Sequence, residues 1–233
     1  MSAPLVEERS RAASFGTGGA EPYARALRAA DSHVLYLEEL RDDQSLSSSS
    51  MDFARWNGAA DRVDVALLGS VRGPVLDVGC GPARMVRAAV AMGLTVLGLD
   101  VSPTAVELGR EAGLPMHEGS VFDPIPDEGA WHTVLLVDGN VGIGGDVARL
   151  LSRCAELLAP DGEVVVELHP DPSRDHRYTG RLVYIHGGYS ESFPWAEVGI
   201  AGVSRRAPQA GLTLRQAWSA GDRRFCRLAK TLA

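Results

Sequence analysis

Residues 75–84 read VLDVGCGPAR: an apolar run ends at Asp77, and Gly79 and Gly81 follow at alternate positions. Glycine lacks a Cβ atom and adopts positive φ at no steric cost, so the chain can turn tightly here and expose its backbone to a ligand. Such a turn after a strand suits a nucleotide, a phosphate or a nucleoside-bearing cofactor. Taken alone, the same two glycines are equally typical of an ordinary turn.

Two familiar glycine loops do not match this stretch. A dinucleotide-binding loop, Gly-x-Gly-x-x-Gly, needs its third glycine at position 84, where the chain has Arg84. A phosphate-binding P-loop needs Gly-Lys-Ser/Thr, which does not follow. Asp100 stands about 20 residues after the loop, at the end of the next apolar run, where a carboxylate can accept hydrogen bonds from both hydroxyls of a ribose. The alternative role for Asp100 is to cap the following helix.

The elements that must position these residues alternate between short apolar runs and amphipathic segments. Ser102 is a good N-cap, and Pro103 suits the first position of a helix. The alternation indicates right-handed βαβ units and a parallel sheet. Strands are predicted over 74–79, 95–100, 114–120, 133–138 and 163–168, and helices over 83–93, 102–113 and 146–162.

The flanking segments follow other patterns. The tract GNVGIGGD at 139–146 fits either a flexible connection or a close approach of the backbone to a ligand. Outside the alternating region we expect, in chain order, a helix over 23–30, a polar loop over 42–50, a helix over 53–69, an inserted hairpin or lid over 179–198, a helix over 199–207 ended by Pro208, and an antiparallel hairpin over 212–232.

Composition narrows the function class. The chain has 233 residues and a formal net charge of −7, which disfavours a nucleic-acid-binding groove. Its three cysteines lie far apart without metal-ligand spacing, which predicts no metal site and a reducing, cytoplasmic location. The acidic start of the chain does not resemble a signal peptide, and no stretch is long and apolar enough to span a membrane, so we expect no membrane partner.

Several motifs in order give the chain a family resemblance. The runs VLDVGCGPAR, VLGLDVSPTAVELGR, EGSVFD, TVLLVDGN and LLAPDGEVVVEL, between residues 75 and 168, resemble class I S-adenosylmethionine-dependent methyltransferases. The resemblance implies an α/β, Rossmann-like, doubly wound and mostly parallel seven-stranded sheet with a C-terminal antiparallel hairpin. It also suggests an N-terminal helical or cap segment over 1–70 and a cofactor-binding domain over 71–233, with a lid insertion at about 171–198.

The first motifs imply contacts to S-adenosylmethionine. Asp77, Gly79 and Gly81 would shape the loop under the methionine part of the cofactor, and Asp100 would hold its ribose. Cys80 lies within this cofactor loop. Because its neighbours are apolar, we interpret its side chain as a small filler and not as a nucleophile.

The later motifs imply the adenine and methyl-transfer ends of the site. Val101 would pack on the adenine face, while Ser120 and Val121 occupy the positions where the family contacts the adenine edge. The family often has an acid at the first of these two positions, so Ser120 departs from the pattern. Asp138 and Gly139 would end the fourth strand beside the methionine and the incoming nucleophile.

Methyl transfer from a sulfonium is an in-line displacement, and a base is needed only where the acceptor must lose a proton. His169, at the end of the fifth strand, is the candidate base, with Asp138 as its competitor. The alternative role for His169 is to satisfy a loop carbonyl. We expect a small organic acceptor from secondary metabolism, which suits the aromatic and histidine residues expected around the pocket: Tyr23, Trp56, His169, Tyr178, Tyr184, His186, Tyr189, Phe193 and Trp195. Two alternatives stay open, a non-catalytic cofactor-binding module and a nicotinamide oxidoreductase, and Arg84 argues against the second.

Overall fold

The computed structural model describes residues 14–15, 22–29, 35–40, 46–50, 53–184 and 187–231. In this part of the chain, no helix combines the length and the apolar character needed to cross a membrane. The predicted pocket residue His186 lies outside the described residues.

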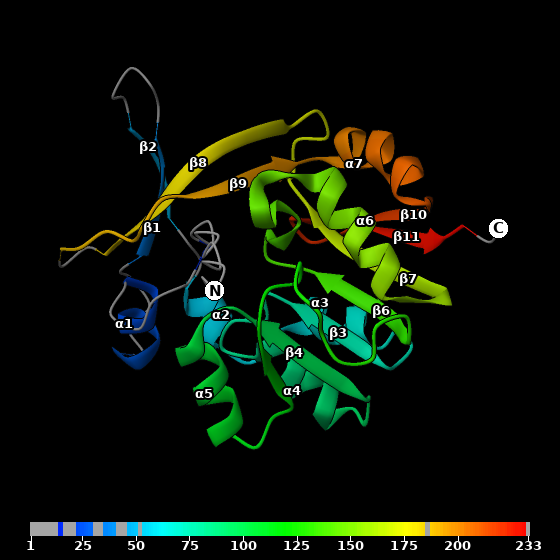
Figure 1. The fold of residues 1–233 in the computed structure, drawn as a ribbon, viewed down its shortest axis with the longest axis horizontal. Coiled ribbons are helices and arrows are strands. Elements are labelled where there is room, and N and C mark those ends of the chain that lie inside the picture. The colour runs from blue at the N-terminus through cyan, green and yellow to red at the C-terminus, as the bar shows by residue number, and fades with distance from the viewer. Residues whose placement is uncertain are drawn as a thin grey trace, which may run out of the picture.

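A seven-stranded sheet forms the centre of the molecule (Figure 1). The five strands numbered β3 to β7 run parallel to one another. Strand β11 pairs antiparallel with β7, and β10 pairs antiparallel with β11. The predicted fold class and the C-terminal hairpin are therefore confirmed. Across the sheet the strands are β10 (Leu212–Ala220), β11 (Arg223–Lys230), β7 (Leu158–Leu168), β6 (Trp131–Leu136), β3 (Val75–Val78), β4 (Val96–Asp100) and β5 (Met116–Glu118).

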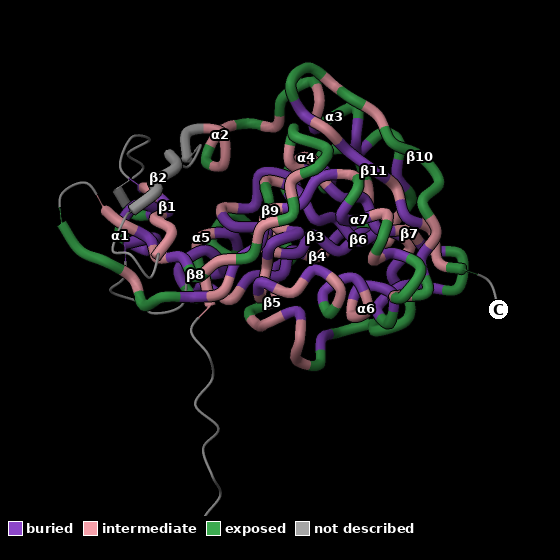
Figure 2. Tube along the Cα trace, turned by 90° about the horizontal axis from the view of Figure 1, so that it is seen from above, coloured by how far each residue is buried: buried purple, intermediate pink, exposed green. Residues whose placement is uncertain are grey.

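Helices cover both faces of this sheet because its central strands are apolar on both sides. In β6, Val134 and Leu136 pack into one core, while Leu135 packs into the other. The strands are accordingly buried in the middle of the molecule (Figure 2). One core includes α6 (Val147–Leu157) and α7 (Ile200–Arg206), and the other includes α3 (Arg62–Leu68), α4 (Arg84–Ala91) and α5 (Pro103–Glu111).

A second, four-stranded antiparallel sheet, which we call the cap sheet, lies beside the first. It brings two distant parts of the chain together, since Leu37 pairs with Leu182. The predicted hairpin over 179–198 is present in it, but its first strand begins earlier than expected. In order, its strands are β2 (Leu46–Ser50), β1 (Leu35–Leu40), β8 (Asp175–Tyr184) and β9 (Phe193–Val198).

The cap sheet corrects the expectation for the N-terminal segment. The polar loop predicted over 42–50 is wrong from Leu46 onward, because that stretch is β2 and pairs with β1. Serine-rich segments favour turns locally, so pairing with a neighbouring strand overrode the local preference. The helix predicted over 23–30 is confirmed as α1 (Pro22–Ala29). The division of the chain at residue 70 stays a prediction.

Two predicted helices are shorter than expected. The helix over 53–69 is split into α2 (Phe53–Asn57) and α3, because Asp61 starts a new helix as N-cap and forms a capping box with Asp64. The helix predicted to reach residue 162 ends at Leu157. Pro160 has no amide hydrogen and disfavours helical backbone in the residue before it, so the chain is already extended there.

Candidate functional site

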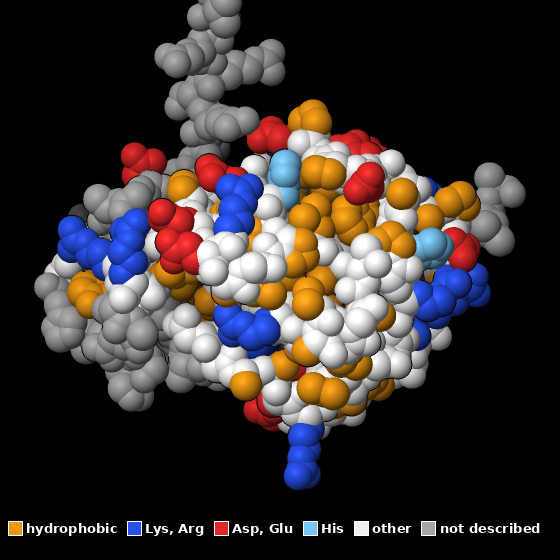
Figure 3. Space-filling view, turned by 90° about the horizontal axis from the view of Figure 1, so that it is seen from below, with side chains coloured by type: hydrophobic (Ala, Val, Ile, Leu, Met, Phe, Trp, Pro, Cys, Tyr) orange, Lys and Arg blue, Asp and Glu red, His pale blue; other side chains and the backbone are white. Residues whose placement is uncertain are grey.

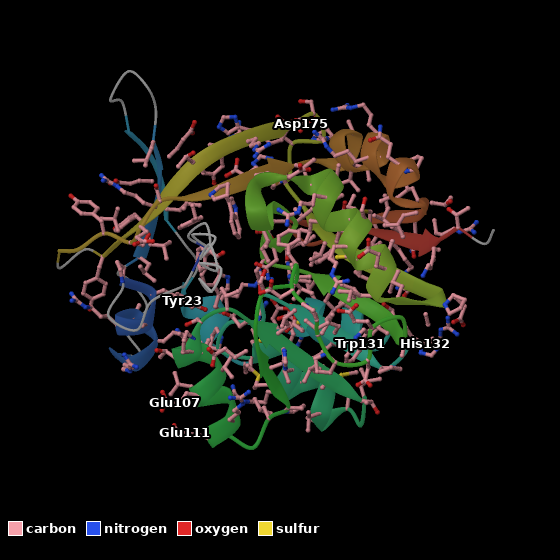
Figure 4. The ribbon with its side chains drawn as sticks, in the orientation of Figure 1. Tyr23, Glu107, Glu111, Trp131, His132 and Asp175 are labelled. Carbon is pink, nitrogen blue, oxygen red and sulfur yellow. The ribbon has the colours of Figure 1, made fainter. Side chains whose placement is uncertain are left out.

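A cavity of about 1100 Å³ lies at the carboxyl ends of the parallel strands, under the cap sheet. Open α/β sheets place their ligands at this edge. The cavity is lined by Asp77 and the glycine loop, by the ends of β4, β6 and β7, by Trp56 of α2 and by Trp195 of β9. His132, at the start of β6, lies far from Tyr23 of the cap in Figure 4 and instead approaches Asp161.

The glycine loop has the backbone that its residues predicted. Gly79 and Gly81 have φ of +70° and +51°, in the left-handed region where a side chain is strained. A Cβ on Gly81 would lie 2.9 Å from Tyr23 Oη, so the N-terminal α1 reaches this loop. Glycine is therefore required here by conformation and by the close approach of the cap.

Asn140 holds the loop from the other side. It lies in the 3-10 helix η1 (Asn140–Gly145), and its Nδ2 donates to Val78 O at 2.8 Å and to Gly79 O at 2.9 Å. Gly142 and Gly145 of the same tract pack directly against β9, where a Cβ on Gly142 would overlap Ala196 O. The tract is thus a packed connection between the loop and the cap sheet, and its glycines serve that packing.

Asp100 is buried at the end of β4, where the sequence placed it. Its Oδ2 accepts from Gly81 N and its Oδ1 from Ser102 N, both at 2.8 Å. A carboxylate has about four acceptor positions, so two remain. The helix α5 is capped by Ser102 itself. Burial raises the pKa of Asp100 to about 6, against the lowering effect of its backbone hydrogen bonds.

Asp77 is the least compensated group of the cavity. Its side chain is buried, and neither oxygen has a hydrogen-bond partner among the described residues. Burial, followed by the negative charge of Asp138, raises its pKa to about 7. A buried carboxylate without partners is costly, and a bound cation or hydrogen-bond donor would relieve that cost.

Asp138 belongs to a buried ionic network. Arg84 Nη2 donates to Asp138 Oδ2 at 2.6 Å, and Arg84 Nη1 lies 3.0 Å from Asp64 Oδ2. Arg223 joins Asp64 to Glu167, and Glu167 accepts from Asp138 N at 2.7 Å. Asp138 has a φ of +56°, and burial raises its pKa against the opposing charge of Arg84. The sequence singled out Arg84 only as a missing glycine; nothing in its spacing indicated this network.

His169 lies at the carboxyl end of β7 and lines the cavity. Its backbone N–H donates to Val198 O at 2.9 Å, which ties β7 to β9. Asp171 N donates to His169 Nδ1 at 3.1 Å. In this arrangement Nδ1 of the ring acts as the acceptor.

The remaining predicted cofactor residues also lie at the cavity. Val101, Ser120, Val121 and Gly139 line it, and Ser120 Oγ accepts from the amide of Phe122 at 3.2 Å. Cys80 is buried, and burial raises its thiol pKa well above the usual range, in agreement with a filler. No group of three or more His, Cys, Asp or Glu among residues the structure describes could hold a metal ion.

An aromatic wall closes the cap side of the cavity. Phe15 lies at its centre, with ring centroids 5.3 Å from Tyr23 and 5.5 Å from Trp195. Phe193 packs behind the wall in the core, and Tyr189 is 62 % exposed, so neither is a lining residue. The predicted aromatic pocket is confirmed for Tyr23, Trp56 and Trp195 and is wrong for Tyr178 and Tyr184, which do not line the cavity. The sequence analysis missed Phe15.

Comparison with known proteins agrees with this geometry. Residues 75–162 match the model of a methyltransferase domain. A ubiquinone biosynthesis O-methyltransferase of Chelativorans sp. (strain BNC1) is 28% identical over 97 residues, which are 40% of this chain and 38% of that protein. The chain thus matches well under half the length of this curated relative.

Solved structures share the fold. A SAM-dependent methyltransferase from Bacteroides fragilis, in complex with S-adenosyl-L-homocysteine, superposes with a TM-score of 0.72 at 19% identity, covering 91% of this chain and 93% of that one. A 1,6-didemethyltoxoflavin-N1-methyltransferase from Burkholderia thailandensis, with bound 1,6-didemethyltoxoflavin and S-adenosylhomocysteine, gives 0.56 at 16% identity, covering 73% and 77%. At these identities the likeness establishes the fold.

Proposed function

We propose that this chain, which carries a methyltransferase domain over residues 75–162, transfers a methyl group from S-adenosylmethionine to a small organic acceptor. The observation that carries the proposal is a pair of buried carboxylates, Asp77 and Asp100. Both line one cavity, and both can accept further hydrogen bonds. The cofactor has a positively charged ammonium and sulfonium and two ribose hydroxyls, which are the groups that such carboxylates bind.

A small acceptor is favoured by the shape of the site and by the surface. The acceptor end of the cavity lies beneath the aromatic wall and the cap sheet. On the face seen in Figure 3, Lys and Arg side chains of the described residues are scattered among acidic and apolar ones. Together with the net charge of −7, this supports a small molecule over a nucleic acid.

The residues proposed for the cofactor divide along the sheet. Asp77, Gly79 and Gly81 would hold the methionine part, Asp100 the ribose, and Val101 the adenine. When bound, the cofactor supplies an electrophilic methyl group on sulfur. The chain's own contribution is to align the acceptor in line with that methyl group, which can supply much of the rate.

For an acceptor that must lose a proton, we propose His169 as the base in preference to Asp138. The Oδ2 of Asp138 is already occupied by a 2.6 Å hydrogen bond from the guanidinium of Arg84, which leaves it less accessible to an acceptor. Among the described residues, the Nδ1 of His169 accepts a hydrogen bond from one neutral amide, that of Asp171, and water can satisfy this amide instead because Asp171 is exposed. Proton transfer to Nδ1 would release that amide.

Isothermal titration calorimetry tests the cofactor directly. We expect S-adenosylhomocysteine to bind and NAD not to bind, because Arg84 occupies the position where a dinucleotide loop needs glycine. Binding of NAD without a response to S-adenosylhomocysteine would overturn the proposed function. A cell extract can then supply the unknown acceptor. If S-adenosylhomocysteine binds, but the protein forms none from S-adenosylmethionine in any cell extract, a non-catalytic module is favoured.

Asp100→Ala should weaken S-adenosylhomocysteine binding by at least about tenfold, since each lost charge-assisted hydrogen bond is worth about 1.5–3 kcal/mol. Calorimetry measures the affinity, and circular dichroism checks that the fold survives. Glu107→Ala is the control, because Glu107 is exposed on α5 (Figure 4). An unchanged dissociation constant for Asp100→Ala would mean that Asp100 orders its own loop and does not hold the cofactor.

His169→Gln should lower turnover by about 10²–10⁴-fold, which is the usual contribution of a general base. Affinity for S-adenosylhomocysteine should stay as in the wild type, and the acidic limb of the pH–rate profile should flatten. A variant that keeps most of its turnover would remove His169 from the mechanism and leave alignment as the source of catalysis.

A further inference from the structure

The cavity continues past the residues proposed for the cofactor, toward β9 of the cap sheet. The hydrogen bond from His169 N to Val198 O places β9 beside the end of β7. In the sheet, β7 and β4 are three positions apart, or about 14 Å. The β9 end is therefore distinct from the ribose site proposed at Asp100, which leaves it open to an acceptor.

Strand β9 supplies the wall of this end, because residues 194–198 line the cavity. Alternate residues of a strand share a face, so Phe193, Trp195 and Glu197 point the same way. Trp195 and Glu197 line the cavity, and Trp195 lies at 5.5 Å from Phe15 in the aromatic wall. A flat ring fits such a wall, because stacked and edge-to-face aromatic contacts are favourable.

Arg174 and Tyr178 hold the Glu197 carboxylate in place, and the carboxylate can still accept another hydrogen bond. Its Oε2 accepts from Arg174 Nε at 2.9 Å, and Arg174 Nη2 lies 2.7 Å from the same oxygen. Among the described residues, its Oε1 receives a single, long hydrogen bond of 3.4 Å, from Tyr178. An ionised carboxylate accepts at both oxygens, so Oε1 can take a further donor from the cavity.

The charges of Glu197 and its partner determine whether a cationic or a neutral hydrogen-bond donor is favoured at this position. Arg174 compensates the carboxylate, and Arg174 is not among the residues lining the cavity. The pair offers no net negative charge to a cation, which would also meet the guanidinium behind the carboxylate. A neutral O–H or N–H group gains a charge-assisted hydrogen bond at this position without that repulsion.

We propose that Glu197 determines acceptor specificity by accepting a hydrogen bond from an O–H or N–H group of a flat, uncharged aromatic acceptor packed against the aromatic wall. The inference rests on the proposed function and deepens it by naming the substrate class. Its partners Arg174 and Tyr178 are positioning residues that act through Glu197.

Matched probes test the proposal by equilibrium dialysis against protein saturated with S-adenosylhomocysteine. 2-Naphthol has the donor, and 2-methoxynaphthalene has the same ring without it. Wild-type protein should bind 2-naphthol at least about tenfold more tightly, the value of one charge-assisted hydrogen bond. Glu197→Gln should reduce that ratio below about threefold, with 2-methoxynaphthalene binding unchanged, since a neutral amide accepts more weakly.

Glu38→Gln is the control variant. Glu38 also pairs with an arginine in the cap sheet, Arg181 at 2.9 Å, but alternation along β1 puts it on the face opposite to the cavity-lining Leu37. It should keep the wild-type ratio. A wild-type ratio near one, an unchanged ratio in Glu197→Gln, or tighter binding of cationic 2-naphthylmethylamine than of 2-naphthol overturns the proposal. Failure of S-adenosylhomocysteine to bind would instead overturn the proposed function.

Discussion

Replacing Arg223 with methionine should lower the free energy of unfolding by about 3–5 kcal/mol, the usual cost of removing one partner from a buried ion pair. Arg223 is 6% exposed and donates to Asp64 Oδ1 at 2.6 Å and to both oxygens of Glu167 at 2.7 Å. Methionine fills similar space but leaves both carboxylates with less compensation in a site shielded from water. Urea unfolding measures the change.

Arg72→Met provides the matched comparison. Arg72 pairs with Asp161 at 3.2 Å, but both side chains are more than half exposed, so the loss of stability should be much smaller than for Arg223→Met. Arg223→Lys should recover little of the stability, because an ammonium cannot bridge two carboxylates with a rigid fork. A cost below about 1 kcal/mol for Arg223→Met would mean that the network contributes little net stability.

Asp77→Asn should stabilise the ligand-free protein at pH 8, by up to about 4 kcal/mol relative to the wild type. The pKa of Asp77 is raised from 3.8 in the unfolded reference to about 7 in the folded protein, chiefly by burial. The folded state therefore holds a proton that the unfolded state releases. The stability from this group is fully present below pH 3.8 and is lost as pH rises through about 7. Asparagine has no charge to bury at any of these pH values.

Urea unfolding at pH 4, 6 and 8 without ligand measures this difference between variant and wild type. The advantage of Asp77→Asn should grow with pH, while the exposed Asp161→Asn should show no such growth. The same substitution should weaken S-adenosylhomocysteine binding, because the carboxylate proposed to meet the methionine ammonium is gone. A pH-independent difference between Asp77→Asn and the wild type would show that Asp77 is ionised at little cost.

Some of the site follows from local pattern. Gly79 and Gly81 predict a positive φ because only glycine adopts it freely. The structure has left-handed backbone at both positions. Asp100 was placed at a strand end by the length of the apolar run before it. The alternation of strands and helices determined the parallel sheet, since a strand–helix–strand connection has essentially one handedness. These signals lie within a few residues of the features that they predict.

The rest depends on pairing between distant segments. Arg181 bonds Glu38 across 143 positions of sequence, and no local pattern in the serine-rich stretch revealed that β1 and β2 join β8 and β9. The network of Asp64, Arg84 and Arg223 likewise draws single residues from separate helices and strands. Charged residues scattered along a chain usually face solvent, so only burial reveals that these three are partners.

The sequence by itself determined the glycine loop that we propose for the cofactor, because a turn that admits a ligand requires particular residue types at fixed spacing. The wall that we propose for the acceptor was decided by the tertiary structure. Phe15, Trp195 and Glu197 come from opposite ends of the chain and meet only because the cap sheet folds over the carboxyl ends of β6 and β7. Such a wall has no spacing rule of its own, since its geometry is set by the packing of one sheet against another.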